Sequence, residues 1–501
     1  MRAVCGSWLL CGALALAVSD AAAGQHQPSR AVQSSTVKVT AFLSAPDPRV
    51  PWQRKMTQVS GSGAVITGQR ILTSAHVVAG HAAIEVQGAD LGARYTAELE
   101  QICHDCDLAL LRVSDPEFFE GVPALAIGDL PRQQDPVDLY GFPEGGEGLS
   151  ITTGIVSRVE VSDFAHSWRR LLIAQVDSAI NAGNSGGPAV SGGRLVGIAM
   201  QSLEEAENVG YLVPTPVIRH FLDDVRDGRY DGFPELGVFV QTLENAALRE
   251  HLGLGDMKGG VLVTEVSRRG CASGRLRPGD VLLALDGVPV RADNKVDLEG
   301  FRLESTVLEH RAQVGQEITV TVFRDGATRD ERVSMTAPDP LVELGEGPGH
   351  AYRIFAGLVF QPLTLRYLQA FDEKEAPAHL WRHYEHPGDY MAAQGDGQGP
   401  DPREEIVVLT NVLASDLTRG YEGYESAVVE AVDGVRLRSL AHLSELLDKS
   451  SGEFVSLRLE RGAMLTVRRE TAQARSAQIL ERYGVSADRS PGAAPVPASA
   501  F

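Results

Sequence analysis

The chain has 501 residues, of which 43% are hydrophobic and 22% charged, and its formal net charge is −20. This length exceeds one typical core and fits about three domains of roughly 100–200 residues each. The composition is that of a soluble globular protein, and the acidic balance excludes nucleic-acid binding, which needs clustered Lys and Arg.

Residues 1–24 have the pattern of an export signal. Arg2 precedes a short apolar run, and the small residues of "DAAAG" follow that run. The run is too short to predict stable membrane insertion. We therefore expect signal-peptide cleavage and export to a periplasm or out of the cell, with an uncleaved N-terminal anchor as the alternative.

Residues 35–230 form the first predicted domain. Short runs such as "TVKVTAFL", "RILTSAHVV" and "LALLRV" alternate with turn residues, which predicts an all-β barrel or sandwich. The segment "TPVIRHFLDDVRDGRY", with Pro216 in its first turn, predicts a helix that closes this domain.

Three cysteines remain after the predicted signal, namely Cys103, Cys106 and Cys271. An odd number excludes a complete disulfide framework. The pair in "CHDC" favours a local disulfide or two buried thiols over a metal, because two thiolates and one histidine lack the fourth ligand of a structural zinc site. We predict no metal site and no cofactor.

The segment "NAGNSGGPAV" at 181–190 places glycines and a proline around Ser185. Glycine permits positive φ and close backbone approach, which suits a hydroxyl held in one orientation. A serine becomes a nucleophile only with a base nearby, and hydrolysis needs N–H donors for the developing oxyanion. Ser185 is therefore a candidate nucleophile, and the amides of Gly183 and Ser185 are candidate oxyanion donors.

The candidate base is His76 in "ILTSAHVVAG", where small residues leave space for a nucleophile and a substrate. Asp107 is the candidate carboxylate, because it directly precedes the apolar run "LALL" and can be partly buried beside a protonated histidine. Asp105, two residues earlier, is a competing candidate. The junction with the apolar run favours Asp107.

The remaining sequence contains a weak internal repeat. Each copy has the order strand, short helix, strand, strand with a "DG" turn, helix, strand, and is about one small domain long. We predict these parts of the chain: domains at 233–338 and 353–485, a linker rich in Pro and Gly at 339–352, and a disordered tail at 486–501.

The motifs "TSAH", "DLALL" and "GNSGGP", in this order, resemble those of chymotrypsin-type serine proteases. With "GSGAVI", "INAGNSGGP", "GYLVPTPVI" and the PDZ-like repeats, they resemble the HtrA/Deg family over nearly the whole mature chain, and its plant-type members and their bacterial relatives in particular. The resemblance implies a mainly β fold, a chymotrypsin-like double β-barrel followed by two PDZ-like α+β domains. It also implies that His76 is the general base, Asp107 its orienting group and Ser185 the nucleophile.

The same resemblance implies an ATP-independent serine endopeptidase that degrades misfolded or damaged proteins and assembles as a homotrimer or a multiple of it. No Walker loop is visible in the sequence. The alternative is a non-catalytic chaperone or PDZ scaffold that binds peptides and retains the protease fold. The intact His, Asp and Ser argue against it.

Two further expectations concern the catalytic domain. We predict that the primary specificity pocket selects small or medium aliphatic side chains, because its expected lining offers no charge: Ala179, Ile180, Ile198 and Ala199. Asn184 stands where zymogen-activated relatives carry an Asp that pairs with a newly cut N-terminus, and a neutral amide cannot form that ion pair. We therefore predict activation by loop ordering, driven by peptide binding or assembly.

The first repeat is expected to bind peptide C-termini. Lys258, Gly259 and Gly260 are predicted to hold the terminal carboxylate, and a strand starting at Val261 to form the sheet edge that the peptide extends. The second repeat has Glu404 and Glu405 at the corresponding place, where they would repel a carboxylate. We expect this repeat to serve assembly or regulation, or equally to be a degenerate spacer.

Overall fold

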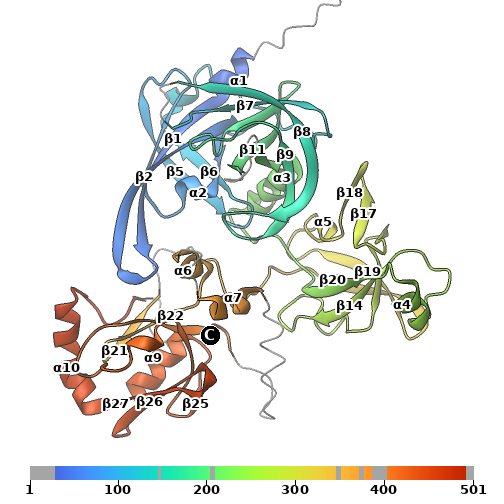
Figure 1. Cartoon of the computed structure of the whole chain (residues 1–501). Coiled ribbons are helices and arrows are strands. Elements are labelled where there is room, and N and C mark those ends of the chain that lie inside the picture. The colour runs from blue at the N-terminus through green and yellow to red at the C-terminus, as the bar shows by residue number, and fades with distance from the viewer. Residues whose placement is uncertain are drawn as a thin grey trace, which may run out of the picture.

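The computed structural model describes residues 29–144, 148–202, 209–345, 351–371, 377–385 and 403–491. Two closed β-barrels are followed by two smaller domains built on antiparallel sheets (Figure 1), which confirms the predicted fold class. The predicted signal peptide lies outside the described residues. Within them, none of the helices combines the length and apolar character that crossing a membrane requires.

The first barrel is formed by the strands on either side of the predicted base. Its strands close in the order β1 (Thr36–Asp47), β2 (Val50–Ile66), β3 (Arg70–Thr73), β6 (Leu108–Val113), β5 (Arg94–Cys103) and β4 (His81–Gln87). Inward-facing side chains alternate along β1, where Val37, Val39 and Ala41 are fully buried. Two short helices, α1 (Arg30–Ser35) and α2 (Ala75–Val78), and the 3-10 turn η1 (Pro116–Phe119) complete this half.

The second barrel carries the predicted nucleophile. Its strands close in the order β10 (Pro188–Ser191), β11 (Arg194–Ser202), β12 (Gly210–Pro214), β9 (Arg170–Val176), β8 (Ser150–Asp163) and β7 (Pro136–Gly141). The predicted closing helix is α3 (Thr215–Asp224), followed by η2 (Val225–Asp227). One apolar cluster joins the two barrels, because Leu72 and Leu108 of the first pack with Tyr140 and Ile198 of the second.

The third body is the domain of the first repeat. Its sheet has the order β13 (Val238–Thr242), β14 (Val261–Val266), β15 (Val281–Leu285), β19 (Glu317–Arg324) and β20 (Ala327–Ser334). The elements beside the sheet are α4 (Ala246–His251), β16 (Val288–Pro289), the hairpin β17 (Lys295–Leu298) and β18 (Phe301–Glu304), and α5 (Thr306–Glu309).

The sheet order corrects the prediction of a peptide-accepting edge at Val261. Val261 pairs with Thr242 of β13 on one side and with Leu282 of β15 on the other, so β14 is an interior strand. The edge strands of this sheet are β13 and β20. The amide of Gly260 also donates to Val290 O at 2.7 Å, so this donor is already used within the domain. A "GG" pair before a run of valines predicts a strand, but it does not predict whether that strand lies at the edge or in the interior of the sheet.

The C-terminal domain is built from the second repeat. Its sheet has the order β21 (Arg353–Phe355), β22 (Leu358–Pro362), β23 (Val407–Val412), β24 (Ala427–Val432), β26 (Phe454–Leu459) and β27 (Met464–Arg468), and β25 (Val435–Arg436) pairs with β24. Its helices and turns are α6 (Leu365–Gln369), α7 (Ala378–Glu385), η3 (Glu422–Tyr424), α9 (Leu440–Lys449), η4 (Glu460–Gly462) and α10 (Arg469–Arg482).

Two residues that the sequence places in the disordered tail, Asp488 and Ser490, bond to the backbone of the C-terminal domain. Ile354 N donates to Asp488 O at 2.6 Å, and Ser490 N donates to Tyr352 O at 3.0 Å. Backbone bonding to β21 outweighs the Ala, Pro and Ser composition here. The rest of the predicted tail, residues 492–501, lies outside the described residues.

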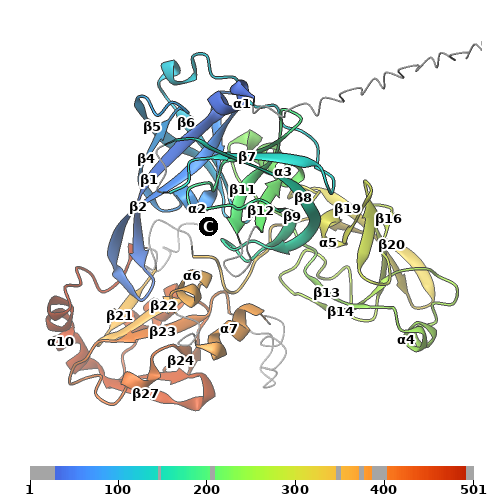
Figure 2. The same cartoon turned by 45° about the horizontal axis from the view of Figure 1, so that its top comes forward.

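The C-terminal domain lies against the barrels rather than apart from them. Both views show α6 and α7 on the side of this domain that faces the barrels, and the β1–β2 hairpin reaching down to the domain (Figures 1 and 2). At the hairpin tip, Gln361 Nε2 donates to Pro48 O at 3.1 Å, and the Trp52 and Tyr352 rings meet edge-on at 6.2 Å. The last domain therefore contacts the first barrel at this hairpin.

Candidate active site

Strand pairing brings two of the predicted catalytic residues together. Thr73 at the end of β3 pairs with Ala109 near the start of β6, so the segment after β3 lies beside the segment before β6. His76 sits on α2 in the first segment, and Asp107 ends the turn between β5 and β6 in the second. Ala75 N donates to Asp107 O at 3.1 Å and fixes the two segments to each other.

Both carboxylate oxygens of Asp107 bond to His76. The His76 Nδ1 atom lies 2.7 Å from Asp107 Oδ2, and the backbone N–H of His76 donates to Oδ1 at 2.9 Å. The Asp107 side chain is 1% exposed, whereas the His76 side chain is 33% exposed. Asp107 has φ +52°, the left-handed region that aspartate tolerates better than most residues. The pair thus has one buried anchor and one accessible imidazole.

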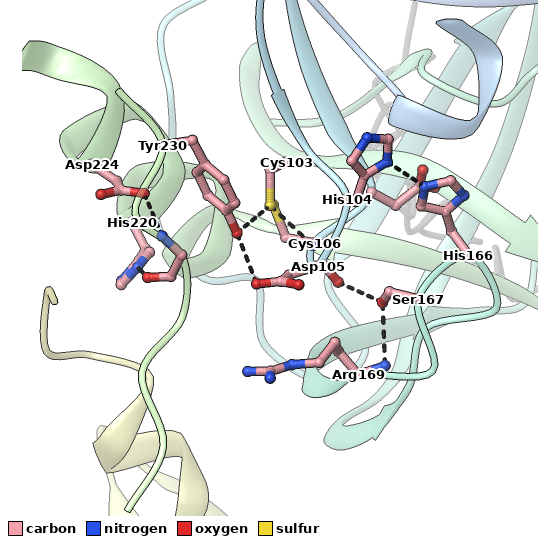
Figure 3. Close-up of a disulfide and its surroundings, with 12 residues drawn as sticks. Cys103, His104, Asp105, Cys106, His166, Ser167, Arg169, His220, Asp224 and Tyr230 are labelled. Atoms are coloured by element: carbon pink, nitrogen blue, oxygen red, sulfur yellow. Dashed lines mark hydrogen bonds between the residues drawn. A yellow bond between two sulfur atoms is a disulfide. The ribbon is translucent and has the colours of Figure 1, made fainter. Parts of the chain in front are cut away.

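The competing carboxylate, Asp105, lies beside Tyr230 and Ser167 (Figure 3). Tyr230 Oη donates to Asp105 Oδ2 at 3.0 Å, and Ser167 Oγ donates to Asp105 O at 2.8 Å. The Cys103–Cys106 disulfide closes the same turn, which is the first of the alternatives that the sequence left open. Asp105 and the disulfide therefore shape the turn that carries Asp107.

Ser185 lies in the connection between β9 and β10, with its hydroxyl turned to the backbone. Ser185 Oγ donates to Met200 O at 3.2 Å. Among the hydrogen bonds of the described residues, none joins this hydroxyl to His76 Nε2, and none uses the amide of Gly183 or Ser185. Within these residues the two amides therefore have no hydrogen-bond acceptor, and the hydroxyl is bonded to the backbone of β11.

Gly183 shows why this loop needs glycine. Its φ is +92°, and a Cβ there would lie 2.4 Å from Phe142 O and 2.8 Å from Glu144 N. Any larger residue would push the loop away from the β7–β8 connection. The glycine-rich pattern that marked Ser185 in the sequence therefore has a direct steric cause.

Asp107 and His76 shift each other's pKa values. Burial disfavours the Asp107 carboxylate, but the charge and hydrogen bonds of His76 outweigh burial and lower the pKa of Asp107. Burial also disfavours the imidazolium, but the charge and hydrogen bond of Asp107 outweigh it and raise the pKa of His76 above its ordinary 6.5. Asp107 thus stabilises the imidazolium that forms when His76 accepts a proton.

These shifts predict the acid side of the pH profile. A general base works only in its neutral form, so kcat/KM for a peptide should fall as the pH drops through the raised pKa of His76. We expect half of the maximal kcat/KM to be reached above pH 6.5, the ordinary value for histidine. Steady-state kinetics over a pH series measures this. A midpoint at or below 6.5 would contradict the assigned pair.

The structure separates the four residues predicted for the specificity pocket. Ile180 and Ala199 belong to the core cluster of the second barrel, and Ala199 O accepts from Gly186 N at 2.8 Å beside the nucleophile. Ala179 is half-buried next to Ile180. Ile198 points to the opposite face of β11 and packs in the cluster between the barrels. The alternation of a strand thus removes Ile198 from the set.

Three polar residues near His76 were not predicted from the sequence. His166 Nε2 lies 2.9 Å from His104 Nδ1, and Arg366 Nη2 donates to His166 Nδ1 at 2.9 Å. The ring centroids of His166 and His76 are 6.3 Å apart. No local pattern marks these residues, because they come from two turns of the catalytic domain and from a helix of the last domain.

A double β-barrel with a histidine–carboxylate pair in one half and a serine in a glycine-rich loop of the other half is the arrangement of the chymotrypsin-like serine proteases. In agreement, residues 61–198 match the family described as trypsin-like peptidase domain, and residues 345–492 match the PDZ domain. The chain is 36% identical over 461 residues to "Protease Do-like 4, mitochondrial" of Arabidopsis thaliana, covering 90% of this chain and 84% of the relative. The chain belongs to the HtrA/Deg family of serine proteases, which confirms the resemblance.

Two further comparisons describe the range of similar proteins. "Protease Do-like 2, chloroplastic" of Arabidopsis thaliana is 35% identical over 464 residues, covering 91% of this chain and 75% of that protein. The solved structure of "HtrA-type protease AlgW with decapeptide" is 26% identical, with a TM-score of 0.48, and covers 62% of this chain and 97% of that chain.

Proposed function

We propose that the chain is an ATP-independent endopeptidase that degrades unfolded or damaged proteins through an acyl-enzyme. The observation that supports this most directly is the buried Asp107 carboxylate bonded twice to His76. Ser185 attacks the scissile carbonyl while His76 takes its proton, and the amides of Gly183 and Ser185 hold the oxyanion. His76 then protonates the leaving amine, and water releases the acyl group.

We propose that catalysis requires an activating rearrangement, because the Ser185 hydroxyl rests on Met200 O. Asn184 Oδ1 is buried and has no hydrogen-bond partner within the described ranges. Because this amide oxygen carries no charge, it cannot form an ion pair with a newly cut N-terminus. Loop ordering on peptide binding or on assembly into a homotrimer, or a multiple of it, is the activating event we propose.

We propose that the first PDZ-like domain captures peptide C-termini at β13. Within the described part of the chain, this strand is one of the two edges of its sheet, and Phe239 on it is 45% exposed. An extended peptide gains main-chain hydrogen bonds at such an edge. The site first expected at Lys258 to Gly260 is replaced by this one, since β14 is already paired on both sides.

We propose a regulatory or assembly role for the C-terminal domain. Glu405, expected to repel a peptide carboxylate, instead accepts from Leu440 N at 2.9 Å, at the start of α9. Glu404 N and Glu405 N both donate to Arg438 O. These residues support the helix, and the segment offers no donor set for a chain end. Contacts with the catalytic domain favour regulation over a passive spacer.

Export is the proposed destination of the chain. Residues 1–24 would serve as a cleavable signal to a periplasm or to the exterior, and the Cys103–Cys106 disulfide suits an oxidising compartment. Mass spectrometry of the N-terminus after secretion tests this proposal, since retention of the first residues in the mature protein would contradict it.

The substrate preference is tested by a matched pair of peptides. Two peptides that differ only in the residue on the acyl side of the scissile bond, valine or arginine, should differ in kcat/KM by on the order of 100-fold in favour of valine. The reason is that Ile180 and Ala199 offer no charge to an arginine. A valine-to-alanine change serves as control and should cost far less. Efficient cutting after arginine would contradict the pocket.

A further inference from the structure

A residue of the C-terminal domain lies at the edge of the active site. Arg366 on α6 donates from Nη2 to His166 Nδ1 at 2.9 Å, and His166 Nε2 in turn lies 2.9 Å from His104 Nδ1. His166 is only 7% exposed, and its ring centroid is 6.3 Å from that of His76. Figure 3 shows His104 and His166 facing each other beside the disulfide turn.

The donor and acceptor properties of Arg366 and of the His166 and His104 rings indicate which ring nitrogens carry protons. A guanidinium has donors only, so His166 Nδ1 must accept the bond from Arg366 and carries no proton. The neutral His166 ring then holds its proton on Nε2 and donates it to His104 Nδ1. The bond from Arg366 therefore favours this one tautomer of His166, and the guanidinium brings a positive charge to the surroundings of His76.

Two further contacts between the C-terminal domain and the barrels hold Arg366 in this place, one made by α7 and one by β22. Trp381 of α7 stacks on Trp168 with centroids 4.9 Å apart, and the Tyr384 ring meets Trp168 edge-on at 6.0 Å. Across the domain, Gln361 Nε2 donates to Pro48 O at 3.1 Å. The β8–β9 turn and the β1–β2 hairpin tip thus bind the same domain on two sides (Figures 1 and 2).

We propose that Arg366 is a positioning residue for the catalytic histidine, delivered by the C-terminal domain. When the domain is docked, Arg366 holds His166 and His104 beside His76 and adds a positive charge. When the domain moves away, the charge leaves and the two imidazoles are released. This inference rests on the proposed role of His76 as general base, and it gives the proposed regulation by the last domain a chemical route.

The electrostatic consequence has a definite sign. Among the described residues, Asp107 of the β5–β6 turn bonds to His76, the His166 ring of the β8–β9 turn lies 6.3 Å from it with His104 behind, and the charge of Arg366 on α6 acts on it. Burial lowers the pKa of His76, Asp107 raises it more strongly, and the charge of Arg366 lowers it. Loss of Arg366 must therefore raise this pKa further. The base would then be protonated up to a higher pH.

The test compares full-length Arg366→Gln with the wild-type enzyme. We expect the acid limb of kcat/KM on a short peptide to shift to higher pH, because the imidazolium is no longer opposed by a neighbouring cation. Arg366→Lys should return the limb toward its wild-type position, since it restores the charge. Trp381→Ala should shift the limb in the same direction as Arg366→Gln by weakening the docking.

Arg475→Gln is the matched control, because Arg475 on α10 pairs with Asp416 of its own domain. Its profile should equal that of the wild type. An unmoved acid limb in both Arg366→Gln and Trp381→Ala overturns the inference, even if the plateau falls, because a lower plateau alone is a structural loss. If Arg366→Gln does not fold, Arg366→Lys and Trp381→Ala decide. If the wild type hydrolyses neither the short peptide nor unfolded casein, the catalytic assignment fails instead.

Discussion

Replacing Ser185 with alanine should abolish the hydrolysis of unfolded casein. The substitution removes the nucleophile but leaves His76, Asp107 and the oxyanion amides in place, so kcat should fall by roughly 10⁶-fold to the level that those groups sustain alone. The release of acid-soluble fragments from casein measures this. Peptide binding by the first PDZ-like domain, measured by fluorescence anisotropy, should persist.

The control for this variant is Ser191→Ala, six residues along the chain in β10. That serine lies outside the nucleophile loop, and its loss should leave hydrolysis near the wild-type level. Substantial casein cleavage by Ser185→Ala would mean that another group is the nucleophile. Loss of both peptide binding and activity would mean that Ser185→Ala is misfolded. The melting temperatures of Ser185→Ala and Ser191→Ala would then show whether the loss of stability is specific to Ser185→Ala.

The change Asp107→Asn should lower kcat by roughly 10⁴-fold. The amide has the same shape, but its NH₂ group donates where the carboxylate accepted, so His76 is held with the proton on the nitrogen that should receive it. The stabilising charge for the imidazolium is lost as well. Steady-state kinetics on a valine peptide gives kcat and KM separately, and we expect KM to change little.

Asp105→Asn separates the two neighbouring carboxylates. Asp105 bonds to Tyr230 and has no hydrogen bond to His76 within the described part of the chain, so its amide variant should retain most of the activity. A larger loss of kcat for Asp105→Asn than for Asp107→Asn would mean that Asp105, and not Asp107, orients His76. The pH profile adds a second criterion, because only the loss of the Asp107 charge should move the acid limb to lower pH.

The short motifs predicted the barrels, and the pairing of His76 with Asp107, because their causes are local. Gly183 is required by a backbone contact within its own loop, and Asp107 is buried because the apolar run begins directly after it. Alternation of β-branched residues likewise predicts strands from a few neighbours. Where a feature depends on nearby residues alone, the sequence is sufficient to predict it.

The features that were missed depend on pairing and docking. Whether β14 is an edge or an interior strand is decided by β13, which lies about twenty residues earlier and leaves no mark in "KGGVLV". The face on which Ile198 lies depends on the barrel that encloses β11. Arg366 meets His166 across 200 residues of chain, and only the docked domains bring them together.

The Cys103–Cys106 bond has a practical consequence for anyone who prepares this enzyme. It closes the turn that ends at Asp107, one residue after the second sulfur. Batches made in a reducing cytosol and batches folded under oxidation will differ at that turn, although their sequence and mass are nearly the same. Specific activities should therefore be compared only between samples whose free thiols have been titrated.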